Sequence, residues 1–401
     1  MRGAFRQILN DTALMERIRS LEPDLMILFN MPGAREFVVL PYVLGIKFVF
    51  LGPYHDLHGY RVPFVPSASP FFLTPFDVNE ELDLGQRIKN TLQNVALYLI
   101  NEFVLSADLL SEFAPAKPWM SVPDMMLKAE LFLVESDHIL DVTKPLLPNT
   151  KLIGGTASSQ AQPLRDPFKI FVENSENGVV VVSFGSSIVN LPQEVADKLA
   201  SAFQRLNQTV VWRVNMTSSD PGKVMTSMWL PQNDLLAQAQ TRLFVSHCGS
   251  SGQYEALYHG VPLLCLPLCC DQYYNAYRSS SKGFGLTADV FSTTDDQLYT
   301  IMAEILNNAT YRDNIRRASK LFRELYKEPQ AEAAFWIDHV MKYGGGYMRW
   351  AGQDIPQWQF LGLDVLACAV GCVVVIVSVV RVVSRMCLGI SCRRERKLKS
   401  E

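Results

Sequence analysis

The sequence lacks the features that mark several classes of protein. Its 401 residues include 19% charged side chains and carry a net charge of −3, so the broadly basic face of a nucleic-acid-binding protein is missing. The eight cysteines form no CxxC pair and lack the spacing of a small disulfide scaffold, which argues against a structural zinc site. No internal repeat or low-complexity tract is present. Apolar residues make up 48%, which excludes wholesale disorder, and the length suggests about two to three domains.

The N-terminal segment lacks a secretory signal, whereas the C-terminal segment has the composition of a membrane anchor. Residues 1–19 contain no long apolar run and no small-residue cleavage site. Residues 365–383 are 19 residues with one charge, Arg381, which is long enough to span a bilayer. A buried core element is the alternative, but a position so near the C-terminus favours the span.

The tail after the span is basic, with six Lys or Arg residues against two Glu, and positive charge stays on the cytosolic side of a membrane. The body is therefore predicted to be lumenal. Since no signal precedes it, we expect that the span alone directs insertion or that the natural start lies upstream of Met1.

Sequons and the last residues fit the same topology. Asn-x-Thr triplets, which are glycosylation acceptors in lumenal proteins, begin at Asn10, Asn207, Asn215 and Asn308. The final residues KLKSE resemble a di-lysine retrieval signal of the endoplasmic reticulum, although a solvated basic tail reads the same way. Cys387 and Cys392 lie beside the span and could carry palmitoyl groups. The predicted location is the endoplasmic reticulum membrane, with a single pass.

Strand and helix patterns alternate along the body, which predicts an α/β fold with parallel sheets covered on both faces. The first half has a loop pattern at 52–78 and a helical pattern at 84–113, and a polar, proline-bearing connection after Gly155 suggests a domain boundary. A second series runs through 165–343, with an amphipathic helix at 192–206 and a capping box formed by Thr294 and Gln297. Short apolar runs predict buried strands at 25–29, 47–51, 129–134, 178–183, 209–214, 243–246 and 261–266.

Three strand ends carry the residues with chemical potential, because ligands of open α/β sheets lie at the carboxyl ends of strands. The first is the Gly-Ser turn Ser183-Phe-Gly-Ser-Ser187, whose backbone N–H groups could approach an anion. The second is SHCGSSG at 246–252, where small residues open a helix and form an anion site. His247 there could donate to a phosphate, or could be a satisfied buried histidine. Glu255, two turns into the helix, could accept from ribose hydroxyls.

The third strand end and a nearby loop complete the set. Asp271 and Gln272 open another helix, where they could cap it or bind sugar hydroxyls. Trp229 and Gln232 share a loop, and an indole face with a two-sided amide suits a uracil ring.

These segments together resemble the signature of the UDP-glycosyltransferases, most closely the membrane-bound, UDP-glucuronosyltransferase-like branch. The matching residues are WLPQNDLL at 229–236, SHCG at 246–249, Glu255, HGVP at 259–262 and Asp271-Gln272. The resemblance implies a GT-B fold of two Rossmann-like domains facing a cleft, the N-terminal one for the acceptor and the C-terminal one for the donor. It implies no metal and no cofactor beyond the UDP-sugar co-substrate.

The resemblance also implies roles for single residues. Trp229 would stack on uracil, Gln232 would bind the nucleotide and Glu255 would accept from the ribose hydroxyls. The diphosphate would be held by His247 with Gly249, Ser250 and Ser251. The donor sugar would be held by Asp271 and Gln272, and further donor-pocket positions are Ser183, Ser186 and Arg213.

The sequence departs from the family pattern where catalysis occurs. The segment with the family's general base, a histidine after its first strand, has no counterpart here, and His55 and His58 lie in a later loop that does not match it. Catalytic residues therefore stay unassigned. Phe29 and Asn30 stand near the place of the family's partner aspartate. Ser251 replaces an asparagine of many vertebrate relatives, so the donor sugar stays open between glucuronate and a hexose.

The resulting prediction is an inverting, metal-independent UDP-glycosyltransferase that transfers a hexose or glucuronic acid to a small lipophilic acceptor. Two alternatives stay open: a catalytically impaired UDP-sugar-binding partner that modulates full-length relatives, and another nucleotide-sugar enzyme such as an epimerase. Expected partners are the donor, the acceptor, the membrane, and homo- or hetero-oligomers with related transferases, but no nucleic acid. The expected parts are a partial acceptor domain (1–155), a donor domain (156–345), a juxtamembrane segment (346–364), the span (365–383) and a cytosolic tail (384–401).

Overall fold

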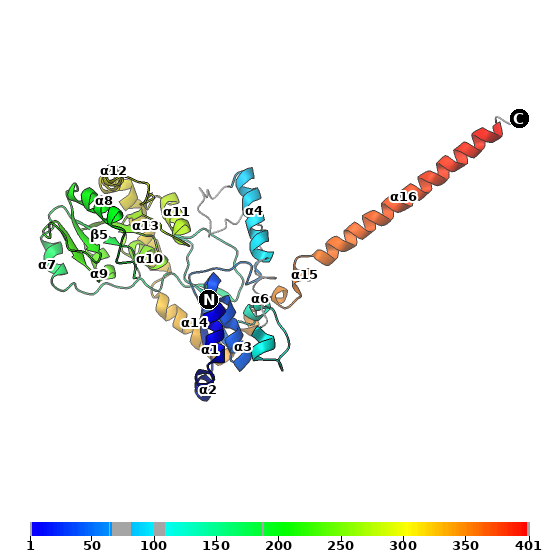
Figure 1. The fold of residues 1–401 in the computed structure, drawn as a ribbon, viewed down its shortest axis with the longest axis horizontal. Coiled ribbons are helices and arrows are strands. Elements are labelled where there is room, and N and C mark those ends of the chain that lie inside the picture. Colours follow the sequence, from blue (N-terminus) through cyan, green and yellow to red (C-terminus); the bar gives the residue numbers. More distant parts are fainter. Residues whose placement is uncertain (1, 64, 66–81, 100–108, 187, 399–401) are drawn as a thin grey trace. The chain divides into compact units, whose positions relative to one another are not determined.

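The computed structural model describes residues 2–63, 65, 82–99, 109–186 and 188–398. By its internal contacts the chain forms two compact units, Met1–Arg349 and Trp350–Glu401 (Figure 1). The first unit contains two parallel β-sheets, and the second contains the long C-terminal helix. Predicted features on residues 64, 66–78 and 100–108, on Ser187 and on residues 399–401 lie outside the described part of the chain.

The N-terminal sheet has four parallel strands in the order β1-β2-β3-β4. These are β1 (Met26–Phe29), β2 (Phe48–Gly52), β3 (Leu131–Val134) and β4 (Thr150–Leu152). Side chains of β2 and β3 alternate between two buried clusters, so that Phe50 and Phe132 join one, while Val49 and Leu131 join the other. Because both faces are buried, these strands are continuous apolar runs.

Helices from both ends of the unit cover this sheet. Those that come early in the chain are α1 (Arg2–Asn10), α2 (Thr12–Ser20), η1 (Pro32–Val38), α3 (Val39–Leu44), α5 (Leu109–Phe113) and α6 (Val122–Met126). Helix α4 (Leu84–Leu99) comes between α3 and α5 in the chain. One face packs against early helices through Phe5, Val39 and Met126. The other packs against α14 (Pro329–Tyr343) through Ala333 and Val340. The division into an acceptor domain (1–155) and a donor domain (156–345) stays a prediction. Helix α14 lies within the predicted donor domain by sequence, but it packs on the first sheet.

The second sheet has six parallel strands in the order β10-β9-β8-β5-β6-β7. They are β5 (Val179–Ser183), β6 (Thr209–Arg213), β7 (Val224–Ser227), β8 (Thr241–Ser246), β9 (Leu263–Cys265) and β10 (Gly285–Thr287). The helices are α7 (Phe168–Glu173), α8 (Gln193–Gln204), α9 (Gln232–Leu236), α10 (Ser250–His259), α11 (Gln272–Ser281), α12 (Asp295–Asn307) and α13 (Ala309–Leu325).

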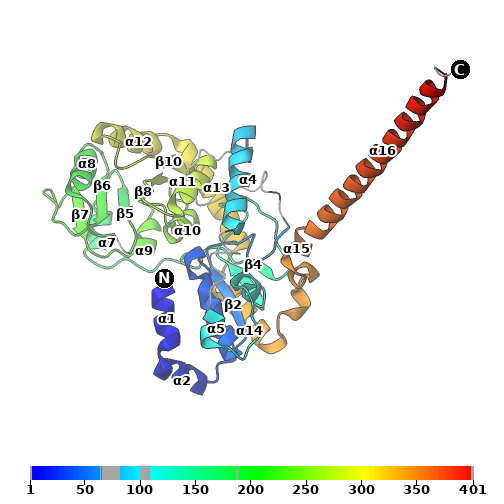
Figure 2. The same ribbon diagram turned by 45° about the vertical axis from the view of Figure 1, so that its right-hand side comes forward.

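Helices cover both faces of this sheet as well (Figure 2). Val180 of β5 lies in a core with Leu199 of α8 and Leu298 of α12. Its neighbour Val181 lies in the opposite core with Ile315 of α13. This is a doubly wound, Rossmann-like sheet, whose strand order reverses between β5 and β8.

The expected strands are confirmed, with bounds within two residues of those observed. The expected burial is wrong for β1, an edge strand whose Ile27 and Phe29 are 50% and 57% exposed. The short strands β4, β7 and β10 are additional to the prediction. The helix expected at 192–206 is α8, and the helical pattern at 84–113 contains α4 and α5. The capping box is confirmed, since Thr294 Oγ1 accepts from the Gln297 backbone and Gln297 Oε1 accepts from the Thr294 backbone.

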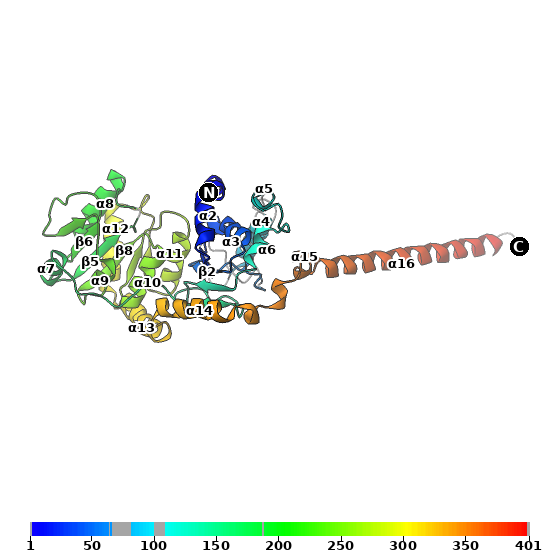
Figure 3. The ribbon, with the colours of Figure 1, turned by 90° about the horizontal axis from the view of Figure 1, so that it is seen from below.

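The C-terminal helix α16 (Leu363–Leu398) follows three short helices, η3 (Gly346–Met348), η4 (Ala351–Gln353) and α15 (Gln357–Phe360). Within α16, Leu363–Met386 is a stretch of 24 residues with mean hydropathy 2.8, long and apolar enough to cross a membrane (Figure 3). At 1.5 Å per residue it measures about 36 Å, against about 30 Å for a bilayer core. The predicted span lies inside this stretch. Insertion and orientation stay predictions.

Two sequons are placed for modification if the body is lumenal. Asn207 and Asn215 lie in exposed loops on either side of β6, whereas Asn308 caps α13 by accepting from the Thr310 backbone at 3.1 Å. We therefore expect the chain made in mammalian cells to gain mobility after glycosidase treatment, an effect that Asn207→Gln together with Asn215→Gln removes. If glycosidase causes no change in mobility and protease added to the cytosolic side digests the body, the predicted lumenal orientation is wrong.

Candidate functional site

The site lies where the second sheet reverses its strand order. β5 and β8 are hydrogen-bonded neighbours, with Ser183 paired to Ser246 at their carboxyl ends. The chain leaves these two strands toward opposite edges of the sheet, because β6 and β7 lie on one side and β9 and β10 on the other. A crevice forms at such a reversal, and ligands of doubly wound folds bind there.

The imidazole of His247 lies between two glycines in this crevice. A Cβ atom on Gly185 would be 2.7 Å from His247 Cε1, and one on Gly249 would be 2.6 Å from Nε2. Both positions therefore need a residue without a side chain, and Gly185 needs one also for its φ of +80°. Burial lowers the pKa of His247, and the carboxylate of Asp271 opposes this. At neutral pH the ring is uncharged and has one N–H to donate.

The N-terminus of α10 adds further donors beside His247. Gly249 is its N-cap residue and supplies no side chain to the first turn, which starts with Ser250 and Ser251. The first N–H groups of a helix have no intrahelical acceptor and carry the positive end of the helix dipole. A disulfide between Cys248 and Cys265, with Cα atoms 5.3 Å apart, ties this turn to β9. The arrangement suits an anion such as a diphosphate.

Glu255 and Gln232 face each other next to this helix end. Gln232 Nε2 donates to Glu255 Oε2, which links the start of α9 to the middle of α10. Burial raises the pKa of Glu255 to about 7, although the hydrogen bond from Gln232 lowers it. Trp229, in the same loop as Gln232, exposes 66% of its surface. An open indole face beside an amide and a carboxyl group suits a nucleoside.

Arg213 and the serines after β5 shape the crevice. The Arg213 guanidinium donates to the carbonyls of Gly185, of Ser186 at 3.2 Å and of Met228 at 3.0 Å. It thereby joins the turn after β5 to the loop after β7. Ser183 is 1% exposed, and its Oγ accepts from the Gly185 backbone at 3.4 Å. For Arg213 and Ser183 the structure therefore shows positioning contacts, and direct donor contacts stay predictions. Ser186 is exposed.

Asp271 and Gln272 lie at the start of α11, where capping and sugar binding are the two predicted roles. Asp271 occupies the N-cap position without a capping hydrogen bond, and its Oδ2 accepts from Asn275 Nδ2 at 2.8 Å. Gln272 Oε1 accepts from the backbones of Leu268 and Cys269 at 2.8 and 3.1 Å. Gln272 therefore fixes its own loop, while the Asp271 carboxylate acts on His247 and belongs to the same crevice.

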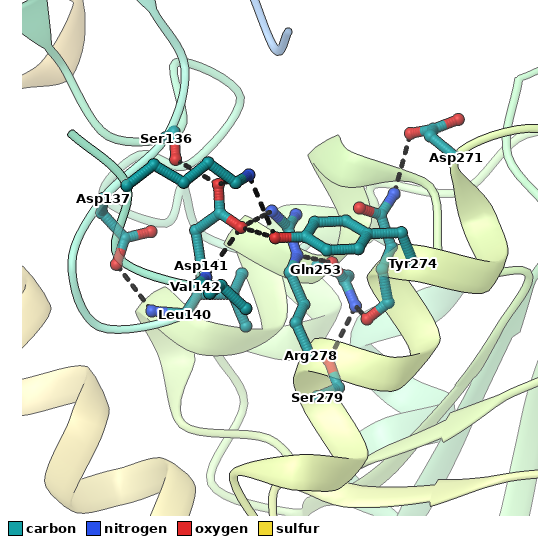
Figure 4. Close-up of polar contacts among 12 residues, drawn as sticks. Ser136, Asp137, Leu140, Asp141, Val142, Gln253, Asp271, Tyr274, Arg278 and Ser279 are labelled. Atoms are coloured by element: carbon teal, nitrogen blue, oxygen red, sulfur yellow. Dashed lines mark hydrogen bonds and ion pairs between the residues drawn. The ribbon is translucent and has the colours of Figure 1, made fainter. Parts of the chain in front are cut away.

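A buried ionic cluster joins the loop after β3 to α11, and sequence reasoning missed it (Figure 4). Asp141 accepts from Ser136 Oγ at 2.7 Å and from the Tyr274 hydroxyl. Lys144 Nζ and Arg278 Nη1 lie 3.6 and 3.9 Å from its carboxylate oxygens. Residues 130 or more positions apart meet here, so no local pattern indicated the contact.

The cluster continues to the crevice. Arg278 Nε donates to Gln253 Oε1 at 2.9 Å, and Gln253 Nε2 donates to the Asn275 carbonyl at 2.5 Å. Asn275 in turn holds Asp271. The loop after β3, from the first sheet, is thus linked through a buried ion pair and a chain of hydrogen bonds to a residue predicted to hold the donor sugar.

His55, in the loop after β2, is buried, and His58 in the same loop is partly buried. Burial, with the charge of Lys144, lowers the pKa of His55 to about 3. His58 Nε2 lies 3.0 Å from Asn94 Oδ1, and burial lowers its pKa as well. Asn30, near the place of the family's partner aspartate, donates to the Tyr54 carbonyl and the Tyr60 hydroxyl. Asn30 thus holds the loop after β2.

The pKa of Glu255 leads to a pH prediction. Ribose hydroxyls donate to the ionised carboxylate, so affinity for UDP-glucose should rise about tenfold between pH 6 and pH 8 as Glu255 loses its proton. The diphosphate of UDP-glucose is a diester whose charge is constant over this range. Titration calorimetry at several pH values measures the effect, and Glu255→Gln should flatten the profile. An equally steep profile in that variant would contradict the role of Glu255.

Comparison with known proteins identifies the family of the chain. The profile of the family described as "UDP-glucoronosyl and UDP-glucosyl transferase" matches residues 3–395. UDP-glucuronosyltransferase 1A7 of Mus musculus is 32% identical, over 97% of this chain and 73% of its own length. UDP-glucuronosyltransferase 1A4 of Homo sapiens is 34% identical, over 90% of this chain and 68% of its own length. UDP-glucuronosyltransferase 1A1 of Mus musculus is 34% identical, over 79% of this chain and 59% of its own length.

Solved structures agree on the fold. The spinosyn forosaminyltransferase SpnP has a TM-score of 0.59 and 17% identity, over 83% of this chain and 80% of that one. The glycotransferase of kitacinnamycin has a TM-score of 0.57 and 19% identity, over 84% of this chain and 83% of that one. At these identities the likeness bears on architecture alone, and the architecture is the GT-B fold predicted from the sequence.

Proposed function

The chain belongs to the UDP-glucoronosyl and UDP-glucosyl transferase family, and from that membership we propose that it binds a UDP-sugar at the carboxyl ends of β5 and β8 and transfers the sugar to a small lipophilic acceptor. The observation that carries the proposal is the His247 ring, which Gly185 and Gly249 accommodate beside the N-terminus of α10. Trp229, Gln232 and Glu255 lie in the adjoining loop and helix, where a nucleoside would follow its diphosphate.

In the proposed reaction the chain's residues act on the leaving UDP. As the bond from sugar to phosphate breaks, negative charge develops on the diphosphate, and the His247 N–H and the N–H groups of Ser250 and Ser251 stabilise it. Asp271 orients the sugar through its hydroxyls, and Gln272 shapes the loop that carries it. The acceptor oxygen attacks the opposite face of the sugar and its proton passes to solvent, so the reaction inverts the anomeric centre. We propose that it proceeds without a metal, with the sugar either a hexose or glucuronic acid.

A second function, binding of UDP-sugar with little transfer, is favoured by the state of two histidines. His55 is buried and His58 is partly buried, burial lowers the pKa of both, and neither matches the family's general base. General base catalysis contributes about 10²–10⁴ to the rate. An assay of the 401-residue chain with several UDP-sugars and a panel of phenols separates the two functions. Robust turnover supports the enzyme, and UDP binding without turnover supports a binding partner of related transferases.

We further propose that α16 anchors the chain in the endoplasmic reticulum membrane, with the body lumenal and the tail cytosolic. The supporting observations are the apolar stretch Leu363–Met386 and the basic residues after it. Association with itself or with related transferases is part of the same proposal.

Replacing Trp229 tests the nucleotide contact. Aromatic stacking on a base contributes about 1–3 kcal/mol, so Trp229→Ala should weaken UDP binding roughly 5- to 150-fold. Trp119 is a matched control, because both indoles are 66% exposed. Trp119→Ala should leave the affinity unchanged by calorimetry. If both variants bind UDP with equal affinity, Trp229 does not contact the nucleotide.

A further inference from the structure

Helix α4 exposes its apolar side chains instead of burying them. Leu84, Ile88, Leu92, Val95 and Leu99 are between 46% and 64% exposed. Their spacing of four, four, three and four residues places them within an arc of about 80° on a helix of 3.6 residues per turn. They form one continuous stripe along the whole helix, which we call the α4 stripe.

The opposite side of α4 is polar and faces the protein. Asn90 and Asn94 are only 6% and 5% exposed. Asn94 Nδ2 donates to the Asn90 carbonyl at 2.8 Å, and Asn94 Oδ1 lies 3.0 Å from His58 Nε2 in the loop after β2. Reciprocal hydrogen bonds of 2.8 and 2.9 Å between Asp83 and Gln86 fix the start of the helix. The helix is therefore held by polar contacts, in an orientation that turns the stripe outward.

An outward stripe of this kind needs a partner. A helix on a globular domain normally buries its apolar side, and a continuous exposed one marks a protein or membrane contact. Arg87 and Lys89 follow on either side of the stripe, each about 100° from its centre on the helical wheel. Apolar residues bordered on both sides by cationic ones are the pattern of a helix that lies in a membrane surface, with its long basic side chains at the phosphate groups.

The rest of the chain supplies the reason to prefer a membrane over another protein. The first unit ends at Arg349 and the apolar stretch begins at Leu363, so 13 residues connect them. Even fully extended, this connection reaches only about 45 Å. If α16 spans a bilayer, the first unit is always within that distance of lipid, and surface contact becomes an intramolecular event.

We propose that the α4 stripe docks on the lipid bilayer, with its five apolar side chains among the acyl chains and Arg87 and Lys89 at the headgroups. This rests on the membrane anchorage proposed above. Docking would hold the loop of His58 at the membrane, from which a lipophilic acceptor would arrive.

Photocrosslinking of the full chain tests this directly. Leu92→p-benzoylphenylalanine is introduced into the chain in vesicles of phosphatidylcholine with about 20% phosphatidylserine. The matched control is Phe291→p-benzoylphenylalanine, at an apolar residue that is 59% exposed in the second sheet's domain. We expect the yield of phospholipid adduct, measured by mass, to be about tenfold higher at residue 92.

A second pair of variants separates docking from mere accessibility. Ile88→Gln with Val95→Gln should lower the adduct yield at residue 92 about fivefold, whereas Ile170→Gln with Leu321→Gln, also at exposed apolar residues, should not. UDP binding in the same samples reports folding, and alkaline extraction of the vesicles reports anchorage by α16 separately. Adducts with a second copy of the chain at residue 92, or equal lipid yields at 92 and 291 in an anchored, UDP-binding sample, would overturn the proposal.

Discussion

Asp141→Ala should lower the free energy of unfolding by about 3–5 kcal/mol. The Asp141 carboxylate is the negative group between Lys144 and Arg278, whose side chains are 11% and 5% exposed. Removing it leaves two buried cations without their counterion and the Ser136 and Tyr274 hydroxyls without an acceptor. Denaturant titration of the chain in detergent, followed by tryptophan fluorescence, measures the loss.

An exposed ion pair provides the control for Asp141. Asp296 pairs with Arg205, but its side chain is 79% exposed, and solvent screens such pairs. Asp296→Ala should therefore change the free energy of unfolding by less than about 1 kcal/mol. If both variants lose the same small amount, the buried cluster does not hold the two sheets' elements together.

The same carboxylate should make the protein sensitive to acid. Burial alone would raise the pKa of Asp141, but the charges of Lys144 and Arg278 outweigh it and hold the pKa below the ordinary 3.8. A lowered pKa in the folded state stabilises the protein above the unfolded value, and this stabilisation is lost as the pH falls below about 4. Asp141→Asn should lack this component of the acid transition while keeping a side chain of similar size.

Gly249→Ala should weaken UDP binding roughly 10- to 150-fold. The backbone at Gly249 has φ −62° and ψ 145°, which alanine adopts without strain, so the variant tests space alone. Its Cβ would lie 2.6 Å from His247 Nε2 and displace the ring from the helix N-terminus. Losing the hydrogen bond from the one His247 N–H to a charged diphosphate, worth about 1.5–3 kcal/mol, accounts for the expected size.

Two other glycines calibrate this result. Gly222 lies in a loop of the same sheet's domain, where an added Cβ atom would have its nearest neighbour 3.5 Å away, so Gly222→Ala should bind UDP normally. Gly185→Ala should weaken binding and also destabilise the fold, because φ there is +80°. Calorimetry with UDP measures all three variants. Normal affinity for Gly249→Ala would show that the diphosphate does not lie at the start of α10.

The central strands were predictable because each is a run of apolar residues buried on both faces. GVVVVS around β5 is an example. LMILF around β1 was predictable from its apolar run alone, because β1 lies at a sheet edge where Ile27 and Phe29 are exposed. The strands that were missed, such as β4 (TKL) and β10 (GLT), are three residues long and lie at sheet edges. Such strands form because a neighbouring strand offers hydrogen bonds, and their own sequence carries little signal.

The features of the candidate site also fall into those that local sequence could predict and those that depend on distant parts of the chain. Gly249, Ser250 and Glu255 follow one another along a strand–turn–helix segment, so local sequence could predict their chemistry. The hydrogen bonds of Arg213 to two separate loops could not be predicted, because they depend on how β5, β6 and β7 lie side by side. The ion pair of Asp141 with Arg278 could not be predicted either, because it joins residues that are far apart in the sequence. The disulfide of Cys248 with Cys265 likewise follows from the pairing of β8 with β9.

Hydrogen exchange of the full chain with and without UDP-glucose tests the central claim most directly. Backbone N–H groups that bind the diphosphate exchange more slowly in the complex. We predict that UDP-glucose slows exchange in the turn after β5, at Gly185 and Ser186, and at the start of α10, from Gly249 to Gly252. Slowed exchange confined to the loops of the first sheet, or no change at the start of α10 under saturating UDP-glucose, would contradict the assignment of this crevice as the UDP-sugar site.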